Sequence, residues 1–426
     1  MNLGIEQLPA RCDVLVVGAG PAGSAAAQML ARGGLDVVLV DGQAFPRDKV
    51  CGDGLIPDAH RALARLGVLD AVMAEARSSR TLGCIAPRGG RIDVPGHLAV
   101  LPRKRLDEII CGAAVSAGAR MFAPLRFTAP LRDGDPSTGR VVGAALQHGQ
   151  TRREIGAPWV VLATGAQPQA LIAAGMCERR TPSGIALRGY IHNAAMTPRI
   201  TSLEVVWHKR LSPGYGWIFP CGGDVFNIGV GVAQSHREAG GGRHAMQDVN
   251  LRDVFAAFKQ LYAPAGELVA GGAWQGEPGH ELKGAPLRCS LEGARLHAPG
   301  LLVTGEAAGS TYAFTGEGIG KAMETGMHAA EAILAGWRPG SPGDGDRDEA
   351  VRDDYAARVL ALKPRFALYE EANRANAYPW LIDLLVWSAR RSPRRLQRMA
   401  GVLEETHIPT DAVTVRGVLR RLFDWR

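Results

Sequence analysis

Three glycines, Gly18, Gly20 and Gly23, stand in the spacing G-x-G-x-x-G between a short apolar run and a run of small residues. Glycines in this spacing allow a tight turn and a close approach of the backbone to a ligand. The N-terminus of a following helix offers N–H groups to a pyrophosphate. Asp41 lies 21 residues after Gly20, at the end of the next apolar run, where a carboxylate can accept hydrogen bonds from a ribose. These residues predict a dinucleotide-binding site.

Other catalytic chemistries find little support in the residue pattern. His192, His208 and His328 are isolated, and none of them begins an H-x-x-x-H or H-x-E spacing. The seven cysteines include no C-x-x-C pair, so no metal site is expected. No G-x-S-x-G motif exists, which leaves the nucleophile of a hydrolase unsupported.

The elements that must hold the glycine-rich turn follow from the hydrophobic periodicity. Residues 12–17 predict a buried strand, residues 24–34 a helix of small residues and residues 36–40 a second strand. Residues 103–118 carry one apolar face and predict a further helix. Residues 159–165 predict another strand that ends in glycine. The first three elements form the start of a βαβ unit, which is the setting that the glycine motif requires.

The second half of the chain contains several strands and then helices. Residues 184–232 predict strands by their alternation and their aromatic and β-branched content, and a helix is expected near 249–262. Residues 301–309 return to a strand that ends in a glycine-rich turn. Residues 339–349 predict a linker, and residues 350–426 predict a helical, basic region.

Length and composition limit the class of protein. With 426 residues, 46% hydrophobic and 21% charged, the chain predicts a globular protein of roughly two to three domains. The odd, scattered cysteines argue against a disulfide framework, and the N-terminus lacks a signal-peptide pattern. No run of about 18 uncharged apolar residues predicts a membrane span. We therefore expect a cytoplasmic protein.

The net charge of +7 is concentrated at the C-terminus. Residues 390–426 contain nine arginines and four acidic residues. Such a run can meet nucleic acid, anionic lipid or an acidic protein, or it can form a solvated face. Residues 379–399 place an apolar block beside an arginine cluster, which fits peripheral contact with the inner face of a membrane or a helical cap on the substrate domain. We expect no nucleic-acid partner.

Four stretches carry a resemblance to a known family. They are GAGPAG (18–23), FPRDKVCGDGL (45–55), GYGWIFP (214–220) and GEAAG…FTGEGIG (305–320). They resemble the geranylgeranyl reductase family of FAD-dependent oxidoreductases. This family belongs to the para-hydroxybenzoate-hydroxylase-like flavoproteins, which also hold aromatic monooxygenases and flavin halogenases. The resemblance covers about residues 10–340, and its second and third stretches lean toward the reductases.

The resemblance implies an α/β fold with a discontinuous Rossmann-like FAD-binding domain. An inserted mixed or antiparallel β-sheet forms the substrate domain, and a helical region follows it at the C-terminus. The implied boundaries are residues 10–80, 100–170 and 285–338 for the FAD-binding domain, 81–99 and 171–284 for the substrate domain and 350–426 for the helical region.

The resemblance also implies FAD as the cofactor and names the residues that would bind it. The glycine motif would cradle the pyrophosphate, and Asp41 would hold the adenosine ribose. Glu306 would lie at the ribitol and phosphates, and residues 316–319 would present N–H groups to the pyrimidine edge of the flavin. The implied FAD-binding residues are Gly18, Ala19, Gly20, Pro21, Ala22, Gly23, Asp41, Gly42, Arg47, Arg103, Gly165, Gly305, Glu306, Gly316, Gly318 and Ile319.

The candidate catalytic residues are Cys51, Gly52, Tyr215 and Trp217. The resemblance places Cys51 near the flavin ring, where its thiol could protonate a carbanion or could pack as a small hydrophobic side chain. Tyr215 and Trp217 could line an apolar cavity for a prenyl chain or could belong to the core. Other aromatic residues of the strands, among them Tyr190, are weaker candidates for the same cavity.

The implied activity is reduction of C=C bonds in an isoprenoid, prenylated or other hydrophobic substrate by hydride from reduced flavin. The alternative is a monooxygenase or halogenase that works through a flavin hydroperoxide, and a third interpretation is a flavoprotein that only carries electrons. Thr164-Gly165 stands where related monooxygenases carry Asp-Gly, a motif tied to both FAD and NAD(P)H. A ferredoxin or a separate flavin reductase is therefore the expected electron donor.

Overall fold

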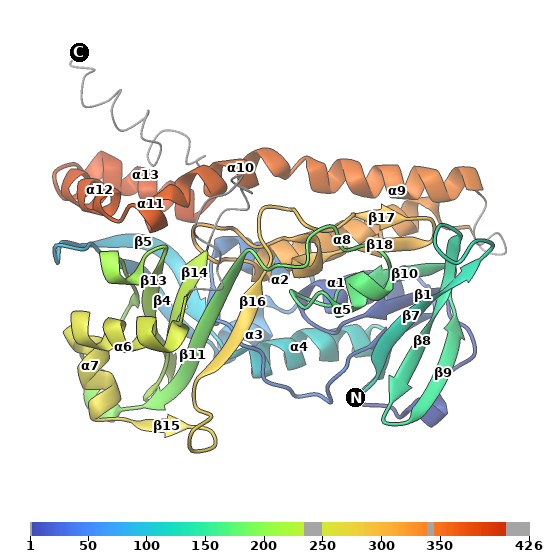
Figure 1. The fold of residues 1–426 in the computed structure, drawn as a ribbon, viewed down its shortest axis with the longest axis horizontal. Coiled ribbons are helices and arrows are strands. Elements are labelled where there is room, and N and C mark those ends of the chain that lie inside the picture. Colours follow the sequence, from blue (N-terminus) through green and yellow to red (C-terminus); the bar gives the residue numbers. More distant parts are fainter. Residues whose placement is uncertain (1, 234–248, 339–344, 406–426) are drawn as a thin grey trace, which may run out of the picture.

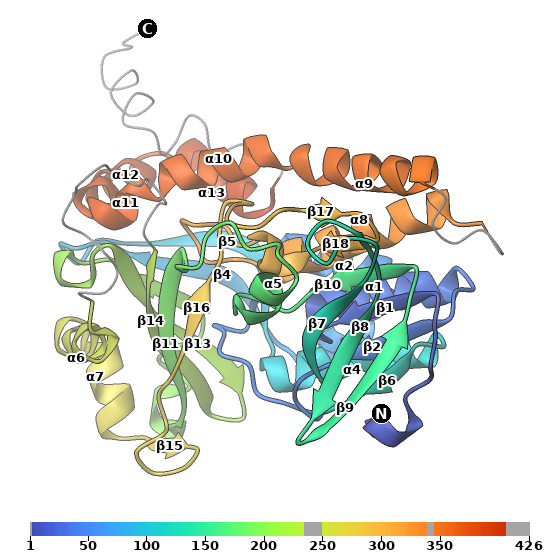
Figure 2. The same cartoon turned by 45° about the vertical axis from the view of Figure 1, so that its right-hand side comes forward.

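Two sheet-based parts lie side by side, and a layer of helices from residues 345–403 covers one side of both (Figure 1). The computed structural model describes residues 2–233, 249–338 and 345–405. The same covering layer is seen when the molecule is turned by 45° (Figure 2).

The first part is built on a mainly parallel sheet. Its strands, in spatial order, are β17 (His297–Ala298), β18 (Leu301–Val303), β10 (Trp159–Leu162), β1 (Val14–Val17), β2 (Val37–Val40) and β6 (Arg120–Phe122). Strand β1 is central, and Val14 pairs with both Val37 and Trp159 in parallel register. The runs VLVV, VVLV and WVVL are buried throughout, as expected for parallel strands that are covered on both faces.

Helices of small residues pack closely on one face of this sheet. Helix α1 (Pro21–Arg32) begins directly after the glycine-rich turn and contacts α4 (Arg103–Ser116) and α8 (Ile319–Gly336). A Cβ atom on Gly326 would lie 2.1 Å from the backbone oxygen of Ala22. Glycine at that position therefore allows α8 to approach α1, and this approach brings the residues before α8 to the glycine-rich turn.

The other face of the parallel sheet is covered by an antiparallel meander of β7 (Arg126–Asp133), β8 (Arg140–His148) and β9 (Thr151–Gly156). Its inward side chains, such as Phe127, Leu146 and Ile155, share one hydrophobic cluster with Leu15 and Val38 of the parallel sheet. The short helix α5 (Gln169–Ala173) packs beside β7.

The second part is a large, mostly antiparallel sheet. Its strands, in spatial order, are β15 (Ala273–Gln275), β11 (Gly184–His192), β14 (Val225–Ala233), β13 (Gly214–Gly222), β12 (Leu203–Val206), β4 (Arg77–Ile85), β5 (Arg91–Val100) and β3 (Gly54–Leu55), with β16 (Lys283–Leu287) paired to β11. Strand β3 and the start of β4 join this sheet, although both precede residue 81. The region between them contains α2 (Pro57–Arg65) and α3 (Leu69–Glu75).

The two faces of the second sheet have different coverings. Helices α6 (Leu251–Leu261) and α7 (Ala263–Ala270) pack on one face, where Phe255, Phe258 and Leu268 meet residues of β11, β13 and β14. The other face turns toward the first part and toward the C-terminal helices. This second face can therefore form a wall of a cavity.

The C-terminal region is helical where the structure describes it. It contains α9 (Gly345–Leu360), α10 (Lys363–Ala372), α11 (Arg374–Ala377), α12 (Trp380–Arg390) and α13 (Pro393–Leu403). Helix α9 begins at Gly345, so the expected linker at 339–349 is too long by five residues at its end. Residues 339–344 and 406–426 lie outside the described part. None of the described helices is long and apolar enough to cross a membrane.

Candidate active site

A cavity of about 1050 Å³ lies between the two parts, and α12 and α13 close one side of it. Its wall contains the turn after β1, the segment from Arg47 to Gly54, the end of β10 and the segment before α8. Strands β12, β13 and β14 supply the opposite wall. Most of the residues singled out from the sequence therefore meet in one space.

Three of the expected cofactor residues do not line this cavity but shape the backbone beneath it. Ala19 donates its N–H to Oδ2 of Asp41 at 2.9 Å. A Cβ atom on Gly23 would lie 1.8 Å from the backbone oxygen of Gly18, and one on Gly305 would lie 2.6 Å from the Cβ of Ala22. Gly23 and Gly305 therefore allow close packing of the backbone, and Ala19 helps to hold Asp41.

The glycine-rich turn has a space beside it that a dinucleotide phosphate would fit. Gly20 is the N-cap of α1, so the free N–H groups of the first turn face the cavity. A Cβ atom on Gly20 would point toward Arg47 and Arg103, at 3.6 Å and 3.9 Å from their Nη2 atoms. An anion placed there would lie between a helix N-terminus and two guanidinium groups, which fits the pyrophosphate of FAD.

Two aspartates hold these arginines in place. Asp107 accepts from Nη1 of Arg47 at 3.0 Å and from Nε of Arg103 at 2.7 Å. Burial alone would lower the pKa of the Arg103 guanidinium. The charge of Asp107 and its hydrogen bonds raise this pKa, and the net result is a pKa above the ordinary value. Asp41 lies 3.4 Å from Nε of Arg47. The positive charge beside the turn is thus fixed in position before any ligand binds.

The segment before α8 carries the second set of expected cofactor residues. Gly316 has a φ of +70°, and Gly318 caps α8, so the N-terminus of an 18-residue helix faces the cavity. Oε2 of Glu306 lies 4.0 Å from Nζ of Lys49. Gly165, which has a φ of +72°, lies beside Glu306. A helix N-terminus stabilises negative charge, as a reduced flavin ring requires.

The loop with Cys51 is held by a buried polar network. Asp53, in a left-handed conformation with a φ of +63°, accepts hydrogen bonds from the hydroxyl of Tyr190, from Nδ2 of Asn227 at 2.8 Å and from the N–H of Arg103 at 3.2 Å. Asn227 also donates to the backbone oxygen of Cys51 at 2.8 Å. Cys51 and Gly52 are therefore fixed against the cavity by their neighbour Asp53.

Asn227 is a site residue that the sequence analysis missed. It is fully buried in β14, and its Oδ1 accepts from Nε1 of Trp217 at 2.9 Å. It thus orients an aromatic side chain of the cavity and the Cys51 loop together. The available signal was an amide side chain within the apolar run VFNIGVGV, because a buried amide needs several partners. Tyr190 was a weaker candidate for the wall of the cavity. Its hydroxyl instead donates to Asp53, and Tyr190 is not among the residues that line the cavity.

Burial raises the pKa of the cavity acids. It raises the pKa of the Cys51 thiol, although Arg103 beside it acts in the opposite direction. Burial and the carboxylates of Asp58 and Glu405 raise the pKa of Glu317 to about 8. Burial also raises the pKa of Asp53 to about 6, against the hydrogen bond from Tyr190. At neutral pH the cavity therefore holds a neutral thiol and a largely protonated Glu317.

Away from the charged residues, the cavity wall is aromatic and aliphatic. Trp207, Tyr215, Trp217 and Phe219 form a row with neighbouring ring centroids 5.8 to 6.5 Å apart. The hydroxyl of Tyr215 donates to the backbone oxygen of Thr315, which ties this row to the segment before α8. The C-terminal helices add the side chains of Ile382, Leu385, Val386, Met399, Val402 and Leu403.

Glycines in β14 make room for this row. A Cβ atom on Gly229 would lie 2.3 Å from Cζ2 of Trp217. The indole can approach the backbone of β14 this closely only because no side chain is present there. This part of the wall is apolar and has few polar groups that would hold a polar ligand.

Comparisons with known proteins agree with this arrangement. Residues 11–249 match the family model described as an FAD binding domain. Menaquinone reductase of Mycolicibacterium smegmatis is 36% identical over 339 residues, which cover 76% of this chain and 77% of the relative. Digeranylgeranylglycerophospholipid reductase of Methanosarcina mazei is 30% identical, with 75% of this chain and 74% of the relative covered.

Solved structures share the fold at lower identity. A geranylgeranyl bacteriochlorophyll reductase-like protein from Thermoplasma acidophilum aligns with a TM-score of 0.70 at 20% identity, over 97% of this chain and 96% of the other. A flavin-dependent brominase also aligns with a TM-score of 0.70, at 18% identity, over 97% and 98% of the two chains. Reductases and halogenases therefore share this architecture.

Proposed function

The chain belongs to the geranylgeranyl reductase family of FAD-dependent oxidoreductases, and from this premise we propose that it saturates a C=C bond in the prenyl chain of a lipid such as a prenylated quinone. The observation that carries the proposal is the apolar cavity of about 1050 Å³, which runs from the segment before α8 to the C-terminal helices. Such a wall can hold a flexible hydrocarbon along its length and present one bond to the cofactor.

The residues of the chain would share the chemistry as follows. Reduced FAD, when bound, supplies a hydride. Gly18, Gly20 and the arginines at positions 47 and 103 would hold the pyrophosphate, and the N-terminus of α8 would stabilise negative charge at the ring. Cys51 would give its thiol proton to the substrate carbon next to the one that receives the hydride. The aromatic row would position the chain and exclude water.

The test is incubation of the FAD-loaded protein and a chemical reductant with a prenylated quinone, followed by oxidation in air and mass spectrometry. Saturation of a prenyl bond leaves the product two hydrogen atoms heavier after oxidation, whereas a reduced quinone ring returns to the starting mass. A product that has gained oxygen or halogen would instead favour monooxygenase or halogenase chemistry. Recovery of unchanged substrate from every prenyl lipid tested would contradict the proposal.

The electron donor is proposed to be a ferredoxin or a flavin reductase. Thr164 stands at the cavity where related monooxygenases carry an acidic residue, and it supports the expectation of weak nicotinamide use. We expect NADH and NADPH to bleach the flavin slowly, and a reduced ferredoxin or a flavin reductase to bleach it faster. Anaerobic stopped-flow absorbance measures both rates. Rapid, stoichiometric bleaching by either nicotinamide alone would overturn this prediction.

A polyprenyl lipid resides in the bilayer, so the proposed reaction requires the protein to reach its substrate at a membrane. The described part of the chain has no helix that could span one. We therefore propose peripheral contact, in which the prenyl chain leaves the lipid phase and enters the cavity.

A further inference from the structure

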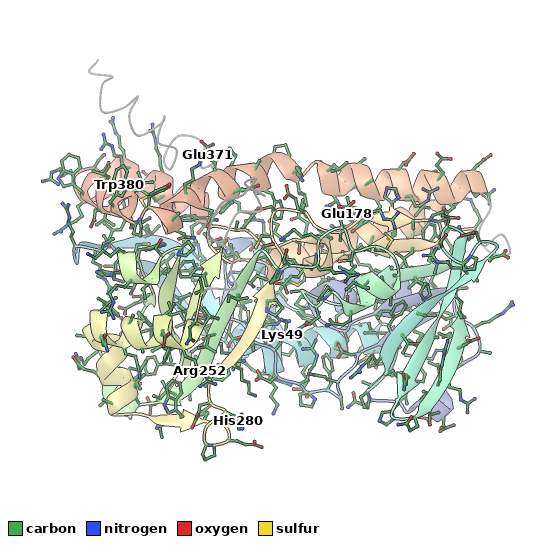
Figure 3. The ribbon with its side chains drawn as sticks, in the orientation of Figure 1. Lys49, Glu178, Arg252, His280, Glu371 and Trp380 are labelled. Atoms are coloured by element: carbon green, nitrogen blue, oxygen red, sulfur yellow. The ribbon has the colours of Figure 1, made fainter. Side chains whose placement is uncertain are left out.

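Large aromatic side chains are exposed on the C-terminal helices. Tyr378, Trp380 and Trp387 are 58%, 54% and 49% exposed, although aromatic side chains of this size are usually mostly buried. Trp380 and Trp387 are seven residues apart in α12 and lie on the same side of the helix. Trp380 lies at the outer edge of the helical layer (Figure 3). Tryptophan and tyrosine favour the boundary between lipid and water.

Exposed arginines lie next to these aromatic residues. Between residues 374 and 398 the chain has six arginines and a single acidic residue, Asp383. Asp383 accepts from the backbone N–H of Arg88 at 3.0 Å and lies 3.9 Å from the Arg88 guanidinium, so its charge is compensated. The guanidinium of Arg391 stacks on Trp387 at 4.3 Å from the ring centroid. The surface is therefore both aromatic and strongly positive.

The same helices form the apolar wall of the cavity with their opposite sides. In α12, Ile382, Leu385 and Val386 line the cavity, and Trp380 and Trp387 face away from it. In α13, Met399, Val402 and Leu403 line the cavity, while its arginines are exposed. A single helical layer thus separates the cavity from this aromatic and basic surface.

We infer that this surface docks on an anionic lipid bilayer and that a prenyl chain enters the cavity past α12 and α13. The docking surface, called the α12–α13 face, consists of Tyr378, Trp380, Trp387, Arg390, Arg391, Arg394, Arg395 and Arg398. The tryptophans insert at the level of the lipid headgroups, and the arginines pair with anionic phosphates. The entry path rests on the proposed function, whereas docking itself does not depend on it.

Sedimentation with vesicles tests the docking of the full chain. We expect binding to vesicles of equal parts phosphatidylglycerol and phosphatidylcholine, weaker binding to pure phosphatidylcholine, and loss of the difference at high salt. A variant with Arg390→Ala, Arg394→Ala and Arg398→Ala should bind the anionic vesicles about a hundredfold more weakly, since each basic residue contributes about fivefold. Within the described part of the chain, none of these three arginines forms a side-chain hydrogen bond or ion pair, and all are exposed.

Matched variants separate docking from general damage. Trp380→Ala with Trp387→Ala should also weaken binding, whereas Leu360→Ala, at a residue 53% exposed on α9, should not. Arg152→Ala with Arg153→Ala on β9 removes exposed positive charge far from the α12–α13 face and should leave binding unchanged. Equal binding by all variants, or no binding by the wild type, would overturn the inference. The inference would also be wrong if the wild type did not bind vesicles but formed a dimer in solution that the tryptophan variant abolished.

Turnover distinguishes a failure of docking from a failure of the proposed function. The arginine variant should lose turnover of a prenyl lipid embedded in vesicles and keep turnover of the same lipid in detergent. Loss in detergent as well would show that these arginines support the cavity or the fold, and the docking inference would then be wrong. Vesicle binding by the wild type without turnover of any prenyl lipid would contradict the proposed function and leave docking supported.

Discussion

Replacement of Gly20 by valine is expected to leave the protein folded and to remove FAD from it. The φ of Gly20 is −73°, which any residue can adopt, and its Cβ would meet only the ends of Arg47 and Arg103, at 3.6 Å and 3.9 Å. The valine methyl groups would fill the space proposed for the pyrophosphate. Overlap of this size costs about 3 kcal/mol, which weakens FAD binding by about a hundredfold or more.

The neighbouring glycines provide the contrast. Valine at Gly23 would collide with the backbone oxygen of Gly18, so that variant should fail to fold and is not informative about the ligand. Valine at Gly4, where a Cβ meets nothing within 4 Å, is the matched control and should keep its FAD. Flavin absorbance of the purified proteins measures the cofactor, and circular dichroism measures the fold. A folded Gly20→Val protein with stoichiometric FAD would show that the pyrophosphate lies elsewhere.

Local sequence patterns were sufficient to predict the main strands and helices of the FAD-binding part. The strand expected at 36–40 is observed as Val37–Val40, and the helix expected at 103–118 as Arg103–Ser116. These elements are determined by residues close together in the chain: a fully buried apolar run, and a helix with one apolar face. The glycine motif by itself predicted only a dinucleotide site, because it has a fixed relation to the strand and helix on either side of it. FAD and the fold were implied by the family resemblance of four stretches together, and the matching family model and solved structures confirm both.

Local sequence patterns could not predict the contacts between segments that are distant in the chain. Strand β12 pairs in parallel with β4, more than 100 residues earlier, and the second sheet depends on this pairing. Asn227 joins Trp217 and the Cys51 loop, and Lys321 lies 3.2 Å from Glu405 in the C-terminal region. Each partner has an ordinary local pattern, and only the assembled fold gives it a role. The closure of the cavity by α12 and α13 arises in the same way.

Replacement of Cys51 by serine is expected to leave FAD bound and reduced at the normal rate but to slow product formation. Neither binding nor reduction of the flavin uses the thiol. A serine hydroxyl is a much weaker acid than a thiol, whose ordinary pKa is about 8.5. General acid catalysis typically contributes roughly a hundredfold or more, so a loss well above tenfold is expected in single-turnover product formation.

Cys84 offers a matched control in the same cavity. It also lines the wall, and burial raises the pKa of its thiol to about 12, but it lies on β4 in an apolar cluster. Cys84→Ser should change turnover little and cost some stability, because it places a hydroxyl among apolar side chains. Equal turnover losses in the two variants would mean that both act through packing, and Cys51 would then have no special role.

The pH dependence of turnover separates Cys51 from Glu317, a cavity carboxyl group that is also largely protonated at pH 7. A general acid must be protonated, so turnover falls as the pH rises through its pKa. Burial raises the pKa of Cys51 above its ordinary value, whereas the pKa of Glu317 is about 8. With Cys51 as donor, turnover should stay level through pH 8, and Glu317→Gln should have little effect on it. A decline centred near pH 8 that Glu317→Gln abolishes, with turnover unchanged in Cys51→Ser, would assign the proton to Glu317 instead.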